Sequence, residues 1–234
     1  MAMNFVWFRI LFVFLLNFLF IYNNSFASTI AKEQHFIAGE HFKILPQNLH
    51  NSPELDKLFI NNTSSVVIKP QVIMFFSYGC LGCRQVNKEF NKWERSKGSK
   101  VVIHRYPVSF NKPWESLAKF YYTHQEFFPN NDGEQIFTEI YNNNKRLWLE
   151  SEMINFYEKL NIPKDQVLKK YNSFDIDRKV KKATEIANYY KIGITPNIIV
   201  NGKNNSYMVN FSMVPDPQTL LQVVNYLLQK NPNK

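Results

Sequence analysis

Cys80 and Cys83 are the only two cysteines among the 234 residues, and they stand three positions apart. The thiolate form of cysteine attacks disulfides, and a second thiol one helical turn away can then resolve the mixed disulfide. A disulfide between residues so close in sequence would close a very short loop and add little to stability. The pair therefore predicts redox chemistry by thiol–disulfide exchange.

Two other readings of the cysteine pair are a structural metal site and an inert buried pair. A structural zinc ion takes four ligands, so a zinc site here would need histidines as well. The histidines are not paired with one another at the usual metal-ligand spacing; they are His35, His41, His50, His104 and His124. We therefore expect no metal, and no cofactor other than the redox-active Cys80–Cys83 disulfide.

The segments around the cysteines predict a strand, a helix and a second strand. Residues 72–76 are all apolar, as in a strand that is covered on both faces of a sheet. Helical periodicity runs from residue 81 to about residue 95, and residues 101–108 then read as a second strand. This order predicts a right-handed βαβ unit.

The predicted helix distinguishes the two cysteines. Val86, Phe90 and Trp93 lie on one face of it, and Cys83 extends that face by one turn, so Cys83 should point inward. Cys80 precedes the first full turn, where unpaired backbone N–H groups and the helix dipole stabilise negative charge. We therefore expect Cys80 to attack first and Cys83 to react only after Cys80 has engaged a substrate.

The segment between residues 113 and 192 is predicted to be helical. Its first helix carries an apolar stripe made of Trp114, Leu117, Ala118, Tyr121 and Tyr122. Further helices are expected over residues 134–141, 152–160, 164–171 and 175–190, and Gly193 should end the last of them. This segment should therefore be an all-helical insertion.

Strands return after the helical block. Residues 197–200 and 207–211 predict an antiparallel hairpin with a loop longer than two residues. Asp216 and Pro217 should cap a final helix. The apolar stripe of that helix consists of Leu220, Leu221, Val224, Leu227 and Leu228.

The order of elements predicts an α/β protein with a thioredoxin fold, βαβ followed by ββα, that carries an inserted all-helical domain. A short edge strand over residues 41–45 and a short helix over residues 52–59 should precede it. The expected boundaries are residues 1–27 for a signal peptide, 28–69 for an N-terminal extension, 70–112 for the first half of the thioredoxin fold, 113–192 for the helical insertion and 193–234 for the second half.

The N-terminus reads as an export signal. Arg9 is its only charged side chain, residues 10–21 are apolar except for one asparagine, and Ser25–Ala27 is a small-x-small cleavage pattern. We expect cleavage after Ala27; the alternative is an uncleaved membrane anchor whose apolar stretch begins near Phe5. In either case the rest of the chain enters a compartment where disulfides persist.

The net charge of +9 raises the question of a nucleic-acid or membrane partner. The densest basic stretch, residues 178–182, lies on a predicted helix beside Asp175, Asp177 and Glu185. Charges of both signs on one helix indicate a solvated face. We therefore expect no nucleic-acid partner.

A second motif, Thr195–Pro196, stands directly before a predicted strand. A proline there cannot donate to the sheet ladder. One reading is a trans proline at a strand start. The other is a cis proline beside the active-site sulfur, with neighbouring backbone groups free to pair with a substrate chain. The nearby cysteine motif favours the second reading.

At this point the chain resembles the DsbA-type periplasmic thiol:disulfide oxidoreductases of the thioredoxin superfamily. The resemblance rests on residues 75–83, Phe-Phe-Ser-Tyr-Gly-Cys-Leu-Gly-Cys, and on residues 193–196, Gly-Ile-Thr-Pro. The helical block also lies where that family inserts its helical domain. The likeness spans most of the chain, from Phe42 to Lys230.

The resemblance implies a role for each motif residue and a set of partners. The roles are Cys80 as exposed nucleophile, Cys83 as resolving thiol, Pro196 as cis proline with Thr195 in substrate binding, and Leu81 and Gly82 as residues that tune the motif. Such an enzyme is a periplasmic monomer that passes its disulfide to newly exported, unfolded proteins bearing thiols. A quinone-linked inner-membrane oxidase of DsbB type reoxidises it, and neither metal nor nucleic acid takes part.

Three features depart from the family pattern. Leu81–Gly82 stands where the strongest oxidants carry Pro-His, whose imidazole helps hold the thiolate, so we expect a weaker oxidant. Asn87 stands where such enzymes have an acidic residue, four positions after the second cysteine. The lead-in over residues 28–69 is longer than the family minimum, and an N-terminal extension could support dimerisation.

Two alternatives to an oxidase stay open. An isomerase or reductase of the same fold would be kept reduced by a membrane electron donor, and Thr195 before the proline fits that reading too. A non-catalytic thioredoxin-fold binding module would use the aromatic surface, although both cysteines at the helix start argue against it.

Overall fold

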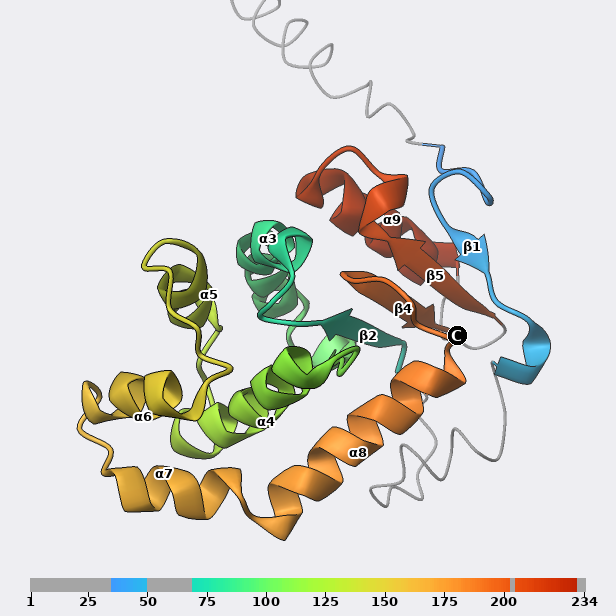
Figure 1. Cartoon of the computed structure of the whole chain (residues 1–234). Coiled ribbons are helices and arrows are strands. Elements are labelled where there is room, and N and C mark those ends of the chain that lie inside the picture. The colour runs from blue at the N-terminus through green and yellow to red at the C-terminus, as the bar shows by residue number, and fades with distance from the viewer. Residues whose placement is uncertain (1–34, 50–68, 203–204, 231–234) are drawn as a thin grey trace, which may run out of the picture. The chain divides into compact units, whose positions relative to one another are not determined.

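Five strands form one mixed sheet in the order β1-β5-β4-β2-β3 in the computed structural model (Figure 1). The strands are β1 (Lys43–Ile44), β2 (Gln71–Phe76), β3 (Val102–Pro107), β4 (Asn197–Asn201) and β5 (Ser206–Asn210). β2 runs parallel to β3 and antiparallel to β4, and β5 pairs antiparallel with β4 and β1. The structure describes residues 35–49, 69–202 and 205–230, and those of them from Phe36 onward form one compact unit.

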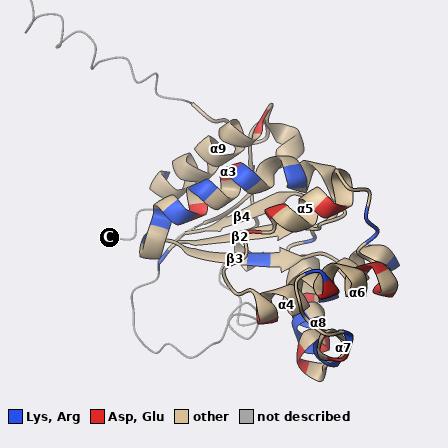
Figure 2. Ribbon diagram, turned by 90° about the vertical axis from the view of Figure 1, so that its left-hand side faces the viewer, with Lys and Arg blue, Asp and Glu red and all other residues tan. Residues whose placement is uncertain are grey.

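The central strand β2 is apolar along its length because both faces of the sheet are covered. Val72, Met74 and Phe76 point into a core shared with α3 (Leu81–Lys97) and α9 (Pro217–Lys230). Ile73 and Phe75 point into a second core on the other face. Figure 2 shows the three layers, with α3 and α9 over one face of the sheet and α4 and α8 beyond the other. The buried strand thus holds the start of α3 in a fixed place.

Five helices form the insertion between β3 and β4. They are α4 (Lys112–Phe127), α5 (Glu134–Tyr141), α6 (Glu150–Glu158), α7 (Lys164–Tyr171) and α8 (Phe174–Tyr189). The described chain also has short 3₁₀ turns at Gln47–Leu49, Gly98–Lys100 and Phe211–Met213. The prediction of a thioredoxin-type order with a helical insertion is confirmed.

The end of α8 differs from the prediction that Gly193 stops this helix. The helix ends at Tyr189, and Lys191 adopts the left-handed conformation with φ +53°. The backbone N–H of Ile192 then donates to the carbonyl of Ala187, which satisfies an open helix-end carbonyl. Gly193 is therefore not needed as a cap.

The buried face of α4 also differs from the predicted stripe. Leu117 and Ala118 are buried as expected, but Tyr121 and Tyr122 are only partly buried. Phe120, Thr123 and His124 are buried instead. The reason is tertiary: aromatic side chains of α6 cover this side of α4, and Phe156 and Tyr157 contact the rings of Phe120 and His124.

β1 covers only Lys43–Ile44 of the expected residues 41–45, and α6 begins and ends two residues earlier than expected. On α9, Val223 is buried, whereas Leu228, which was expected in the buried stripe, is only partly buried. The other elements agree with expectation. β1 is an edge strand, and the Asp216 carboxylate accepts a hydrogen bond of 2.7 Å from the Thr219 backbone N–H at the start of α9. On α8, Lys179 pairs with Glu126 and Asp175, and Arg178 pairs with Asp175, so its basic stretch is a solvated, ion-paired face.

The predicted signal peptide over residues 1–27 and the predicted helix over residues 52–59 lie outside the described residues. Within residues 35–49, 69–202 and 205–230, no helix is long and apolar enough to span a membrane.

The buried His124 makes the stability of the fold depend on pH. Burial lowers its pKa to about 4, against a smaller opposing contribution from Asn131. A histidine in the unfolded chain has a pKa of about 6.5. Between about pH 6.5 and pH 4 this histidine is therefore protonated in the unfolded chain but neutral in the folded protein. We predict that, because of His124, the free energy of unfolding falls by about 2 kcal/mol when the pH is lowered from 7 to 5.

Urea unfolding at pH 7 and pH 5 measures this loss. A His124→Phe variant keeps an aromatic ring in the same pocket and cannot titrate, so its unfolding free energy should fall by about 2 kcal/mol less than that of the wild type. Equal losses in the two proteins would show that His124 is not the titrating group.

Candidate active site

Cys80 and Cys83 lie at the N-terminal end of α3, directly after β2. Cys80 is the N-cap residue with an extended backbone, and its sulfur accepts a hydrogen bond of 3.1 Å from the backbone N–H of Cys83. Both cysteines are free thiols in this structure. Cys83 is completely buried, so it points inward as predicted. Cys80 is only 8% exposed, so it is buried too, which differs from the exposed nucleophile that the family resemblance implies.

The surroundings drive the pKa values of the two thiols apart. The pKa of Cys80 falls to about 6, chiefly because the Cys83 thiol donates a hydrogen bond to it, with further help from the Thr195 side chain and from the backbone N–H groups of Gly82 and Cys83. Burial and the neighbouring Cys80 charge raise the pKa of Cys83 well above its usual range. At neutral pH the reduced pair therefore consists of a Cys80 thiolate and a Cys83 thiol.

The loop before β4 completes the site from the far end of the chain. The Thr195–Pro196 peptide bond is cis, and the Cys80 thiol lies 3.4 Å from the carbonyl oxygen of Thr195. The sheet brings these residues together, because Asn197 at the start of β4 pairs with Phe75 near the end of β2.

Gly82 allows the proline loop to approach the cysteine motif closely. A Cβ atom at this position would lie 3.1 Å from Cδ of Pro196 and 3.3 Å from Cδ1 of Phe211. Those distances are shorter than ordinary van der Waals contact, so a larger residue would push against the loop. The structure thus brings Cys80, Gly82, Thr195 and Pro196 together as one site.

Two apolar side chains at the site are exposed. Leu81 lies between the cysteines with 55% of its surface exposed, and Ile194 precedes Thr195 with 48% exposed. Exposed large apolar groups beside a reactive sulfur can contact apolar side chains of another polypeptide. Leu81 and Ile194 are therefore accessible for such contacts.

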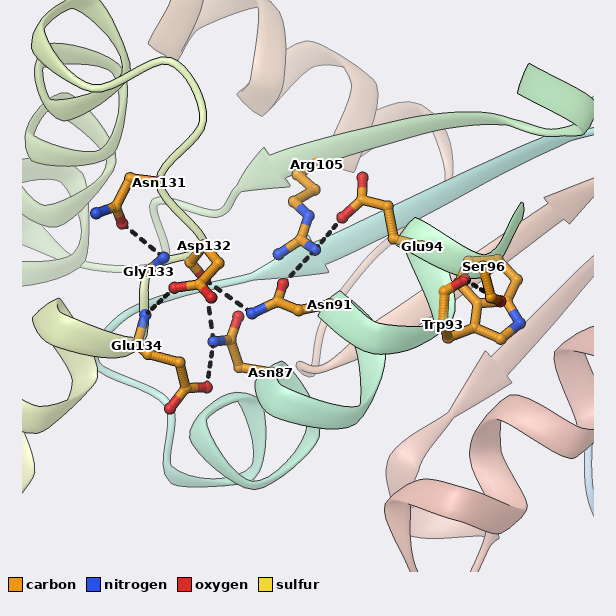
Figure 3. Close-up of polar contacts among 10 residues, drawn as sticks. All are labelled: Asn87, Asn91, Trp93, Glu94, Ser96, Arg105, Asn131, Asp132, Gly133 and Glu134. Carbon is orange, nitrogen blue, oxygen red and sulfur yellow. Dashed lines mark hydrogen bonds and ion pairs between the residues drawn. The ribbon is translucent and has the colours of Figure 1, made fainter. Parts of the chain in front are cut away.

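Behind the motif, an amide cluster joins α3 to the loop before α5 (Figure 3). We define it as Asn87, Asn91, Asp132 and Glu134. Both asparagine side chains donate to the carbonyl oxygen of Asp132, at 3.1 and 3.0 Å. Asn87 also donates to the carboxylate of Glu134 at 2.6 Å. The loop before α5 is thereby tied to the helix that carries the cysteines.

Arg105 of β3 extends this network. Its guanidinium donates to the side-chain oxygen of Asn91 at 2.6 Å and forms an ion pair with Glu94. The sequence analysis noted Asn87 only because related enzymes have an acidic residue at this position. It did not predict the other residues of this network. The signal available was the spacing of Asn87 and Asn91, two amides four residues apart on the same side of α3, next to its apolar face.

Comparison with known proteins identifies the family. A thioredoxin family model matches residues 62–214, more than half of the chain. The thiol:disulfide interchange protein DsbA of Azotobacter vinelandii is 30% identical over 163 residues, which cover 69% of this chain and 75% of that protein. The chain belongs to the DsbA-type oxidoreductases of the thioredoxin superfamily. DsbA of Pseudomonas syringae pv. tomato is 29% identical over 182 residues, 76% of this chain and 84% of that protein.

Solved structures agree on the fold of this DsbA-type protein. The crystal structure of Pseudomonas aeruginosa DsbA superposes with a TM-score of 0.68 at 24% identity and covers 83% of this chain and 94% of that one. DsbA of Xylella fastidiosa gives a TM-score of 0.67 at 19% identity, covering 84% and 98%. The curated relatives are named thiol:disulfide interchange proteins, so the chain is a thiol:disulfide oxidoreductase and not the non-catalytic binding module that the sequence also allowed.

In the part of the chain that the structure describes, no group of three or more histidine, cysteine or acidic side chains could hold a metal ion. The groups that can transfer electrons at this site are the two cysteine sulfurs, as in other proteins that use a redox-active cysteine pair.

The low pKa of Cys80 can be measured by the ultraviolet absorbance of the thiolate in the reduced protein. We predict one thiolate with a titration midpoint at about pH 6. A Thr195→Val variant loses the hydroxyl that stabilises the thiolate, so its midpoint should be higher.

A Cys80→Ser variant should show no titration in this range. The lowered pKa of Cys80 also affects the stability of the reduced protein. A cysteine in the unfolded chain has a pKa of about 8.5, so the thiolate contributes its full stabilisation of the folded state above that pH. This stabilisation is lost as the pH falls through about 6. A midpoint near pH 8.5 in the wild type would contradict the assignment.

Proposed function

We propose that this DsbA-type protein is an exported oxidase that introduces disulfides into other exported proteins. The observation that carries the proposal is the difference between the two thiols: the pKa of Cys80 is lowered to about 6, and Cys83 is buried with a raised pKa. A stabilised thiolate favours the reduced form of the pair, and a protein whose reduced form is stabilised is an oxidant.

The proposed reaction passes through a mixed disulfide on Cys80. A substrate thiolate attacks the Cys80 sulfur of the Cys80–Cys83 disulfide, and Cys83 leaves as a thiolate and takes up a proton. A second thiolate of the same substrate then attacks the substrate sulfur of the mixed disulfide, and Cys80 leaves as a thiolate. The substrate loses two electrons and two protons: the electrons reduce the protein's disulfide to a thiolate and a thiol, one proton goes to Cys83 and the other is released to solvent. The low pKa of Cys80 suits it to the role of leaving group.

Thr195 and Pro196 are proposed to bind the substrate chain beside the reactive sulfur. In support, the Thr195 carbonyl lies 3.4 Å from the Cys80 sulfur and Pro196 lies against Gly82. An extended substrate segment could pair with backbone groups of this loop. Leu81 and Gly82 are proposed to tune the motif, Leu81 by its exposed apolar surface and Gly82 by its close contact with the loop.

We infer that the protein is a weaker oxidant than the strongest members of its family. A strongly oxidising DsbA has a cysteine pKa of about 3.5, whereas the pKa of Cys80 is lowered only to about 6. The motif also has no imidazole, and Pro196 and Phe211 leave little space for one at Gly82. The rival function is an isomerase or reductase kept reduced by a membrane electron donor, which the Thr195–Pro196 sequence would also fit.

The compartment and partners follow from the same proposal. Residues 1–27 would act as a cleavable export signal, which places the oxidoreductase in the periplasm, and residues 28–69 would form an N-terminal extension. Residues 70–112 and 193–234 would be the two halves of the thioredoxin fold around a helical domain over residues 113–192. The partners would be unfolded proteins with free thiols and a quinone-linked inner-membrane oxidase of DsbB type that restores the disulfide.

Oxidation of a reduced, unfolded model protein tests the proposal. Disulfide-form protein without residues 1–27 should transfer one disulfide per molecule, and a Cys80→Ser variant should transfer none. A Cys83→Ala variant, whose Cys80 has first been activated as a mixed disulfide with glutathione, should become covalently linked to the substrate through Cys80. Reduction of substrate disulfides without any oxidation of thiols would favour the reductase or isomerase instead.

A further inference from the structure

Arg84 occupies a special position beside the reactive sulfur. It follows Cys83 directly and lies one helical turn after Cys80, and its backbone N–H donates to the Cys80 carbonyl oxygen at 3.1 Å. Residues four apart on a helix are neighbours on the same side, and helical side chains lean toward the N-terminus. The guanidinium of Arg84 therefore belongs to the surroundings of the active site, although the thiol chemistry makes no use of it.

The guanidinium is held in place by neutral groups only. It donates to the side-chain oxygen of Asn142, and its central carbon lies 5.3 Å from the centre of the Tyr141 ring. Among the residues that the structure describes, no carboxylate lies within 4.0 Å of it. The same holds for Arg95 and Arg146, whereas Arg105 and Arg178 are paired with Glu94 and Asp175. Arg84 thus has a fixed positive charge with no acidic partner in the described chain.

Tyr141, the last residue of α5, lies next to the first turn of α3. Its ring centre is 5.3 Å from the guanidinium carbon of Arg84, and Arg84 stands one helical turn after Cys80. Burial raises the pKa of Tyr141 to about 12, with smaller contributions from the cysteine pair, and the charge of Arg84 opposes this shift. Tyr141 and Arg84 therefore lie at the end of α3 that carries the cysteine pair.

The helix that supplies Tyr141 and Asn142 is fixed at both ends. The amide cluster ties the loop before α5 to α3 (Figure 3), and the contact of Arg84 with Asn142 ties the other end. α5 therefore lies beside α3 (Figure 1), and it holds the guanidinium without exhausting its five N–H donors. A group held in this way loses little side-chain entropy when a ligand binds.

We propose that Arg84 is a specificity residue that binds a carboxylate of the substrate polypeptide, so that cysteines close to Asp or Glu residues react preferentially. The fork of the guanidinium matches a carboxylate. Leu81, one turn before Arg84, is exposed, so the preferred segment would present an apolar group and an acidic group near its cysteine. The inference rests on the proposed function because it concerns the substrates of that same site.

The test uses three dithiol peptides that differ only in the residue beside one cysteine, which is Glu, Gln or Lys. Rate constants are measured for the wild type, Arg84→Gln and Arg84→Lys, each without residues 1–27. The wild type should oxidise the Glu peptide about threefold to fivefold faster than the Gln peptide, as for an exposed ion pair. The preference should disappear in Arg84→Gln, survive in part in Arg84→Lys, and weaken as the salt concentration rises.

Two further readouts separate this role from others. In Arg84→Gln the ratio of the rate with the Glu peptide to the rate with the Gln peptide should fall to about one, while the pKa of Cys80 stays at its wild-type value. An unchanged Glu preference in Arg84→Gln would overturn the proposal, and so would equal slowing with all three peptides together with a raised pKa of Cys80, because Arg84 would then act on the thiolate.

The reverse reaction, in which the reduced protein attacks the peptide disulfides, gives the same peptide ratios independently of the preferred direction. A wild type that only reduces disulfides would contradict the oxidase function, and its peptide ratio would still decide the role of Arg84.

Discussion

The hydrogen bonds that Cys83 donates to the sulfur of Cys80, from its thiol and from its backbone N–H, are the interactions on which the site depends. The backbone bond makes Cys80 the N-cap of α3, so the groups that begin the helix also stabilise the thiolate. The buried strand β2 delivers Cys80 to that position, and burial of Cys83 prevents both thiols from ionising together. The redox chemistry is therefore a consequence of how one helix begins at the end of a central strand.

Parts of the chain far from the motif complete this helix start. The Thr195–Pro196 loop reaches Cys80 because β4 pairs with β2. On another side, α5 from the helical insertion lies along α3, anchored by Asn87 and by Arg84. The thioredoxin half of the molecule thus supplies the reactive sulfur, and the insertion supplies polar and aromatic groups around it.

The thioredoxin half and the cysteine pair could be predicted from the sequence because their signals are local. The apolar run of β2 and the periodicity of α3 determine that Cys83 points inward, whatever packs against them. The buried face of α4 could not be predicted, since Phe156 and Tyr157 on another helix decide that His124 is covered. The Arg84–Asn142 contact joins positions 58 residues apart, and hydrophobic periodicity along the sequence cannot predict a contact over that separation.

The equilibrium redox potential of the Cys80–Cys83 pair, titrated against glutathione in protein without residues 1–27, tests the central claim most directly. A thiolate stabilised to a pKa of about 6 without a motif imidazole predicts a potential above the glutathione poise of about −220 mV and below the value of about −120 mV known for a strong DsbA. A potential near that of thioredoxin, about −270 mV, would contradict the claim that the reduced form is stabilised and would indicate a reductase or isomerase.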